Sequence, residues 1–250
     1  MSNTSDFRLS LKNRLLSALP ERELDVLKPH LEPVKLSAAD IVYQAGDEIR
    51  HVYFPDNGMI SLLSVTEAGQ TVEVGFTGAE GMVGLPIVLG RNEMPYQAMV
   101  QVPVTGLRAD AKAVLNLFGQ CGIFHDIVLR YTYVVFKQIS QTCVCNHFHT
   151  IEARLCRWLT VMHDRSKNGH LSLTQEFLAN MLGVQRTSIG MIANTLQTAE
   201  IIRYRRGKIE IVDYERLKQS ACECFFIIRT ELEEFLEDKN FPLMSDNKQT

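Results

Sequence analysis

Apolar residues between Ser172 and Val212 recur first at helical spacing and then at strand spacing. Positions three and four residues apart predict the buried faces of two helices, the second beginning near Gln185. The first face holds Phe177, Leu178, Met181 and Leu182, and the second holds Ile189, Ile192, Ala193 and Leu196. Gly183 can end the first helix in a left-handed conformation, and the hydroxyl of Ser172 or Thr174 can cap its start.

Two short apolar runs, Ile201–Tyr204 and Lys208–Val212, follow the second helix, and Arg205, Arg206 and Gly207 supply a hairpin turn between them. Two helices around a glycine turn, followed by a basic hairpin, are the plan of a winged helix-turn-helix. In that plan the second helix enters the major groove of DNA and the wing lies on phosphates. The residues expected to contact DNA are Gln185, Arg186, Thr187, Ser188, Met191, Arg205, Arg206 and Lys208.

The stretch LTQEFLANMLGVQRTSIGMIANTLQTAEIIRYRRGKIEIVDYERL resembles the DNA-binding domain of the Crp/Fnr family, the catabolite-activator-like transcription regulators. The resemblance extends over residues 14–217 and is strongest in the winged helix. It implies that Arg186 pairs with O6 and N7 of a guanine. The family often has a glutamate at the next position and a second arginine one turn later. Thr187 and Met191 stand there instead, so we expect a different operator.

The N-terminal half has the pattern of short strands separated by turn residues, after short helices predicted over residues 7–31 with Pro20 in a first turn. Strands this short, at this spacing, predict a sandwich or jelly roll. The β-prone runs are 34–36, 40–43, 52–54, 59–65, 71–76 and 99–107. The resemblance implies that this region is the family's cyclic-nucleotide-binding-type β-roll.

The family's β-roll holds the nucleotide with a Gly-Glu pair and an Arg-Ser/Thr-Ala motif around a short helix. Here Met82 stands in place of the carboxylate, and Tyr96 and Gln97 in place of Arg-Ser. A buried phosphate without its arginine loses its strongest interaction, so we expect no cyclic-nucleotide binding. The alternative is that Glu80 or Arg91 substitutes from a shifted register. The candidate effector pocket comprises Met82, Val83, Leu85, Arg91, Tyr96, Gln97 and Gln138.

Residues 123–146 contain neither Gly nor Pro and predict a long helix. Apolar and small polar residues recur along it in steps of four and three, which is the spacing of a coiled-coil seam. We therefore predict a dimer interface formed by Phe124, Val128, Tyr131, Val135, Gln138 and Thr142. The alternative is that the helix packs this side against its own β-roll.

These patterns divide the chain into four segments: a β-roll effector domain over 1–121, a dimerisation helix over 122–147, the winged helix-turn-helix over 148–213, and a C-terminal helix and tail over 214–250. The C-terminal helix either packs onto the DNA-binding domain or forms a second dimer contact.

Charge is unevenly distributed although the net charge is only −3. Residues 149–213 contain 9 Lys and Arg against 6 Asp and Glu, whereas the segments on both sides are acidic. The one basic segment is therefore the one expected to contact phosphates. No apolar run approaches the roughly 20 residues of a membrane helix, and the polar N-terminus has no secretory pattern. We expect a cytoplasmic protein without a membrane partner.

Cysteine and histidine spacing suggests no metal site. Cys143, Cys145, His147 and His149 alternate between faces of a helix and would not converge, and the Cys222-x-Cys224 pair has the same defect. Iron–sulfur members of the family use an N-terminal cysteine cluster, whereas the first cysteine here is Cys121. We predict no cofactor and no metal. No catalytic triad signature, paired carboxylates or phosphate-binding glycine motif is present, so we predict that the chain is not an enzyme.

The sequence thus predicts an α+β protein with a β-roll (jelly roll), a long dimerisation helix and a winged helix-turn-helix. The predicted function is that of a homodimeric Crp/Fnr-type transcription regulator that is not gated by cyclic nucleotide. Its expected partners are double-stranded DNA with a palindromic operator and RNA polymerase, while the effector is unknown. The alternatives are a cyclic-nucleotide-gated regulator, a dimeric scaffold that no longer binds DNA, and a thiol redox sensor.

Overall fold

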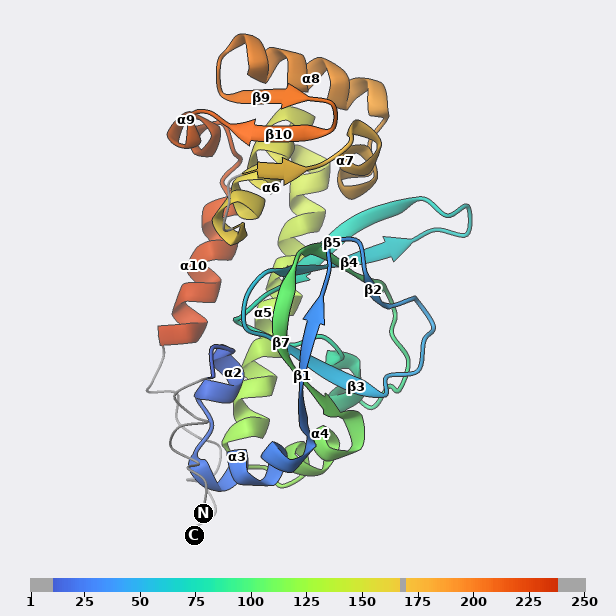
Figure 1. Cartoon of the computed structure of the whole chain (residues 1–250), viewed down its shortest axis with the longest axis vertical. Coiled ribbons are helices and arrows are strands. Elements are labelled where there is room, and N and C mark those ends of the chain that lie inside the picture. The colour runs from blue at the N-terminus through green and yellow to red at the C-terminus, as the bar shows by residue number, and fades with distance from the viewer. Residues whose placement is uncertain (1–10, 167–169, 238–250) are drawn as a thin grey trace. The chain divides into compact units, whose positions relative to one another are not determined.

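A computed structural model describes residues 11–166 and 170–237 of the chain (Figure 1). The chain divides into two compact units. One comprises Met1–Ser61, Phe76–Phe136 and Glu231–Thr250, and the other comprises Leu62–Gly75 and Lys137–Thr230.

The β-roll consists of two antiparallel sheets whose strands match the predicted short runs. The first sheet has the order β1-β7-β3, with β1 Leu31–Leu36, β7 Val104–Asp110 and β3 His51–Pro55. The second has the order β2-β6-β4-β5, with β2 Ile41–Tyr43, β6 Gln97–Val102, β4 Met59–Val65 and β5 Thr71–Thr77. The predicted run 99–107 is in fact two strands that end and begin on either side of Pro103, which has no N–H to donate to a ladder.

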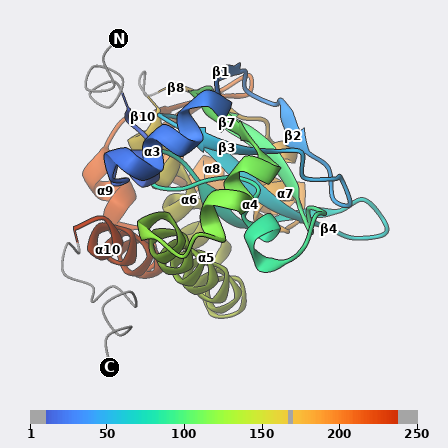
Figure 2. The ribbon, with the colours of Figure 1, turned by 90° about the horizontal axis from the view of Figure 1, so that it is seen from below.

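Short helices accompany the strands of the first unit. They are α2 Arg14–Ser17, α3 Glu21–Leu27, η1 Lys28–His30, η2 Leu85–Leu89 and α4 Ala111–Phe118. Pro20 is the N-cap of α3, as its fixed backbone angle favours. Helices α3 and α4 contact each other at one end of the β-roll (Figure 2). The sequence pattern did not predict α4.

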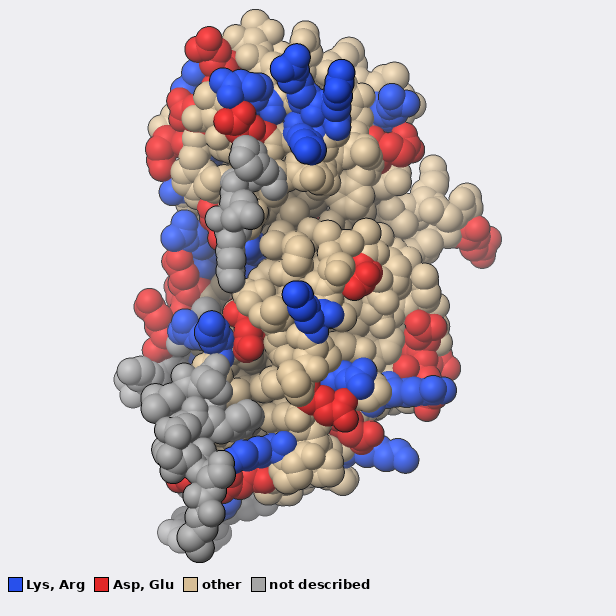
Figure 3. Space-filling view, in the orientation of Figure 1, with Lys and Arg blue, Asp and Glu red and all other residues tan. Residues whose placement is uncertain are grey.

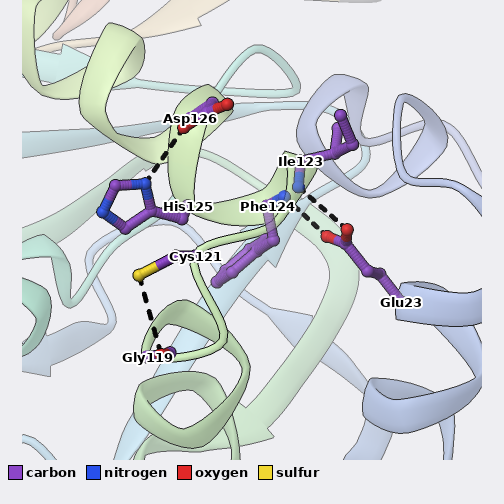
Figure 4. Close-up of polar contacts among 7 residues, drawn as sticks. All are labelled: Glu23, Gly119, Cys121, Ile123, Phe124, His125 and Asp126. Atoms are coloured by element: carbon purple, nitrogen blue, oxygen red, sulfur yellow. Dashed lines mark hydrogen bonds and ion pairs between the residues drawn. The ribbon is translucent and has the colours of Figure 1, made fainter. Parts of the chain in front are cut away.

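The long helix α5, Ile123–Phe148, begins on a buried carboxylate (Figure 4). Glu23 of α3 accepts hydrogen bonds from the backbone N–H groups of Ile123, at 2.8 Å, and Phe124, at 2.6 Å. A carboxylate is favoured at this end of a helix because the first N–H groups lack helical partners and carry partial positive charge. Gly122 is required beside it, since a Cβ there would collide with Glu23.

The second unit contains the predicted helix-turn-helix and wing. The elements of this DNA-binding part are α6 Ile151–Arg165, β8 His170–Ser172, α7 Gln175–Leu182, α8 Arg186–Thr198, β9 Ile202–Arg205, β10 Lys208–Ile211 and α9 Tyr214–Gln219. The strands form one sheet with the order β8-β10-β9. Thr174, rather than Ser172, caps α7, and Gly183 ends that helix at a φ of 61°. The hairpin turn needs positive φ at Arg206 and Gly207, which are at 48° and 74°.

The predicted C-terminal helical run is two helices, because it breaks after α9 and resumes as α10, Cys224–Glu237. Helix α10 packs against α5 of the same chain. In the first unit the rings of Tyr131 and Phe235 have centroids 6.0 Å apart, and in the second Gln141 Nε2 donates to Cys224 Sγ at 3.1 Å. Part of this helix is therefore covered by its own chain.

None of the helices in the described residues is long and apolar enough to cross a membrane.

Replacing Glu23 by Gln should destabilise the first unit, because the amide keeps the shape but not the charge that caps α5. We expect the free energy of unfolding to fall by about 1–2 kcal/mol, measured by urea denaturation. The matched control is Glu21→Gln on the same helix, whose side chain is exposed. Equal effects of the two substitutions would contradict a capping role for Glu23.

Candidate nucleic-acid interface and effector pocket

Helix α8 presents polar side chains at its N-terminal end while its other face is buried. Gln185 is the N-cap and makes no capping hydrogen bond with its side chain, which leaves the side chain available for a ligand. Arg186 and Thr187 are exposed in the first turn, and Met191 is 67% exposed one turn later. Because a helix N-terminus carries partial positive charge, this end of α8 is suited to approach a phosphate backbone.

The wing places further basic groups beside α8. Arg205, Arg206 and Lys208 are exposed at or near the hairpin turn, and Figure 3 shows Lys and Arg side chains gathered over these elements. Arg203 differs from them, since it pairs with Glu210 across the hairpin at 2.8 Å. A shallow groove of about 690 Å³ between helices and wing is lined in part by Arg186 and Arg206.

Two residues that the sequence pattern did not single out tie the wing to α8 and to the segment between β8 and α7. Gln197 Oε1 accepts a hydrogen bond from the backbone N–H of Tyr204 at 2.9 Å. The Tyr204 hydroxyl donates to the carbonyl of Leu173 at 2.8 Å. Both contacts join segments that meet only in the folded chain. No local pattern could have revealed them.

The expected effector residues of the β-roll are not gathered around an open site. Met82, Val83 and Leu85 are buried in its core, and Arg91 is exposed and does not join them. Gln97 is partly exposed and donates to Gln44 at 2.6 Å, while Tyr96 is partly exposed. Gln138 belongs to the second unit, where it lies against Gly75.

Tyr131 of α5 fills the space beside the stretch that matches the family's nucleotide motif. Its hydroxyl lies 2.5 Å from Thr77 Oγ1, and its ring is so close to Gly81 that a Cβ there would collide with it. Burial raises the pKa of Tyr131, so the phenol stays protonated and neutral. The buried carboxylate of Glu80 also raises the pKa of Tyr131, so the nearby charge is negative and would repel a phosphate.

Most members of the dimer seam predicted on α5 are already covered by the chain itself, and dimerisation through this seam stays a prediction. Phe124, Val128, Tyr131, Gln138 and Thr142 are buried within the single chain, and Val135 is partly buried. Heptad spacing identifies which side of a helix is buried, but not whether a second chain or the same chain covers it. In this structure the same chain covers most of that side. The exposed apolar residues of α5 are Leu129, Tyr133, Phe136, Val144 and Phe148.

The structure also corrects the prediction that the cysteines and histidines do not converge. Cys145 and His149 are one helical turn apart, and they meet Cys222 and Cys224 from the start of α10. The ligand atoms of the four residues lie within 4.8 Å of one another. The alternation argument holds only for Cys143 and His147, which are exposed.

The thiols of this cluster influence one another strongly. The hydrogen bond between Cys145 and Cys222, whose sulfurs are 3.5 Å apart, lowers the pKa of Cys145 and raises that of Cys222. The nearby charge of Arg157 also favours the thiolate form of Cys145. Such a set of thiols and an imidazole can bind a thiophilic metal ion.

Comparison with known proteins agrees with both halves of the molecule. Residues 33–121 match the cyclic nucleotide-binding domain family, and residues 153–220 match the Crp-like helix-turn-helix domain family. The fumarate and nitrate reduction regulatory protein of Vibrio cholerae is 23% identical over 211 residues, which cover 81% of this chain and 84% of that protein. Its counterpart in Yersinia pestis is 22% identical over 213 residues, with the same coverage.

Solved structures share the fold. FixK2 from Bradyrhizobium japonicum has a TM-score of 0.63 at 13% identity, over 77% of this chain and 98% of that chain. TTHB099 from Thermus thermophilus, a transcriptional regulator of the CRP family, has a TM-score of 0.61 at 15% identity, over 75% and 96%. A β-roll, a long helix and a winged helix-turn-helix together define a DNA-binding transcription regulator. The chain belongs to the Crp/Fnr family of these regulators.

Proposed function

We propose that the chain acts as a homodimer that binds a palindromic operator, with one α8 in each of two successive major grooves about 34–36 Å apart. The observation that supports this most directly is the exposed polar start of α8 beside the basic wing. The proposal places the protein in the cytoplasm, with promoter DNA and RNA polymerase as partners. The functional segments would be 1–121, 122–147, 148–213 and 214–250.

The exposed residues take different roles in this proposal. Arg186 pairs with a guanine, because a guanidinium in the first turn can donate to O6 and N7 together. Thr187 and Met191 contact thymine methyl groups. The phosphate contacts come from Gln185, Ser188, Arg205, Arg206 and Lys208.

The partner of the exposed side of α5 is a second copy of this chain. Leu129, Tyr133, Phe136 and Val144 follow one another at steps of four, three and eight, which keeps them on one side of the helix. Phe136 is 73% exposed and Tyr133 is 58% exposed, an unfavourable arrangement for an isolated chain in water. A two-fold axis would bury both copies of this stripe at once.

The β-roll in this proposal does not respond to cyclic nucleotides. The support is that Tyr131 fills the space beside Gly81 and that the buried neighbours Met82 and Val83 carry no positive charge. A cyclic phosphate buried among these groups would have no cationic partner, which costs several kcal/mol.

Arg186→Ala should weaken binding to the preferred operator by about 1–3 kcal/mol and relax the preference at one position of each half-site. The operator is first found by selecting bound DNA from a random pool, and affinities are then measured by fluorescence anisotropy. Unchanged base preference in the variant would remove Arg186 from its assigned role. A wild-type protein that binds no duplex DNA would support the scaffold alternative.

Two other arginines serve as comparators. Arg206→Ala should weaken binding to all sequences alike. The slope of the logarithm of the binding constant against the logarithm of the salt concentration should become less steep by roughly one. Arg203→Ala should change little, because this wing arginine is already paired with Glu210. A sequence-selective loss in Arg206→Ala would mean that the wing contacts bases.

Phe136→Glu should dissociate the dimer, because each copy loses the burial of an aromatic ring, about 1.5–3 kcal/mol, and gains a buried charge. Sedimentation velocity over a concentration series measures the shift. The control is Leu89→Glu, which adds the same charge at an exposed apolar residue of η2 in the β-roll. An intact dimer in the Phe136 variant would move the interface elsewhere.

Calorimetric titration with cyclic AMP and with cyclic GMP should give no binding at micromolar concentrations. The physical reason is that the buried residues described at this site, Met82 and Val83, offer no cation to pair with the phosphate. Micromolar binding of either nucleotide would contradict the proposal. Its loss in Arg91→Ala would then identify Arg91 as the substitute cation.

A further inference from the structure

Four metal-binding side chains meet where the end of α5 approaches the start of α10, all within the second unit. Cys145 Sγ lies 3.5 Å from Cys222 Sγ, and Cys224 Sγ lies 3.5 Å from His149 Nδ1. The three cysteines are buried and His149 is partly exposed. The set is therefore largely shielded from water but reachable by an ion.

The separations suit a single tetrahedral ion. Zinc binds sulfur at about 2.3 Å and imidazole nitrogen at about 2.0–2.1 Å, so tetrahedral ligands lie about 3.5–3.8 Å from each other. The ligand atoms here are all within 4.8 Å of one another before any ion draws them together. An iron–sulfur cluster holds its thiolates on different iron atoms and therefore further apart.

Neighbouring groups orient the ligands as they do around metal sites. Glu223 accepts from His149 Nε2 at 2.9 Å, which leaves Nδ1 facing the thiols. A carboxylate on the remote nitrogen of a histidine is the common partner of a metal-bound imidazole. Gln141 Nε2 donates to Cys224 Sγ at 3.1 Å, a contact that strengthens when the sulfur is a thiolate.

A buried cation near the thiols is compatible with a negatively charged site, although the geometry of the four ligands carries the argument. Arg157 is 5% exposed and acts electrostatically on both Cys145 and Cys222. Its Nε has no hydrogen-bond partner within the part of the chain that the structure describes. Three thiolates, a neutral imidazole and a divalent ion carry a net charge of −1, which would compensate a buried guanidinium.

We propose that Cys145, His149, Cys222 and Cys224 form a structural site for one zinc ion. All four positions of the tetrahedron are filled by protein, which distinguishes a structural from a catalytic zinc site. On binding, the thiols that are still protonated release their protons to solvent, so that three thiolates and one neutral imidazole hold the ion. The ion would join the end of α5 to the start of α10, and it depends on no part of the DNA-binding proposal.

The test uses the full chain, purified with a thiol reductant and without chelator, then equilibrated with zinc and desalted. Mass spectrometry of the metals should find one zinc per chain. Cys145→Ser and His149→Asn should lose it, while Cys143→Ser, an exposed cysteine on the same helix, should keep it. Cobalt loaded in place of zinc should give the intense visible bands of a tetrahedral thiolate site in wild type and Cys143→Ser.

Treatment with a chelator gives a second measurement, which does not require the buried variant Cys145→Ser to fold. It should lower the thermal unfolding midpoint of the wild type and of Cys143→Ser, but not that of His149→Asn, whose substituted residue is partly exposed. Circular dichroism of each variant verifies that it is folded.

Several outcomes would overturn the proposal. One is a wild-type protein that retains no zinc after equilibration. Another is equal zinc loss in Cys143→Ser and Cys145→Ser. Iron with acid-labile sulfide would identify a cluster instead. A mass lower by two hydrogen atoms, mapped to Cys145 and Cys222 after purification under reductant, would identify a disulfide.

Discussion

Burial of one side of α5 by its own chain constrains the rest of the molecule. In the first unit Tyr131 contacts Thr77 and leaves no room for a side chain at Gly81. In the second, Gln138 lies against Gly75. Overpacking a well-packed core costs roughly 1–3 kcal/mol, so Gly81 is required by the rigid ring of Tyr131, whereas the flexible end of Gln138 could move away from a side chain at position 75. The opposite side of α5, with Tyr133 and Phe136, stays exposed.

The second unit carries its own connections to the DNA-binding elements. Glu73 of β5 accepts a hydrogen bond from the buried indole of Trp158 on α6 at 3.1 Å. Val72 lies against Gly183, whose left-handed conformation sets the direction from α7 into α8. Ala153 of α6 packs against the cysteine cluster. The turn that leads into α8 is thus packed against β5, and β5 is in turn hydrogen-bonded to α6.

Elements with a strong local signal were predictable from the sequence. The helical spacing of apolar residues and the capping residues Thr174 and Gly183 identified α7 and α8. These signals come from residues that lie within one or two helical turns of each other. Gly207 likewise marked the wing, because a two-residue hairpin needs positive φ. Strand β4 was predicted with its observed limits, and the motif of the winged helix correctly indicated the Crp/Fnr family. Helix α4 was missed, and so was the division of the run 99–107 at Pro103.

The sequence by itself determined the kinds of elements, their order and the exposed chemistry of α8, because these depend on residues a few positions apart. Only the tertiary structure decided what covers each buried side. Most heptad residues of α5 are buried by their own chain, and a heptad spacing is the same whether a helix packs on its own chain or on a second one. Cys145 and Cys222 are brought together across 77 positions of sequence, a distance that only folding closes. The cluster was missed because helical periodicity describes one helix, whereas a tetrahedral site is assembled from several segments.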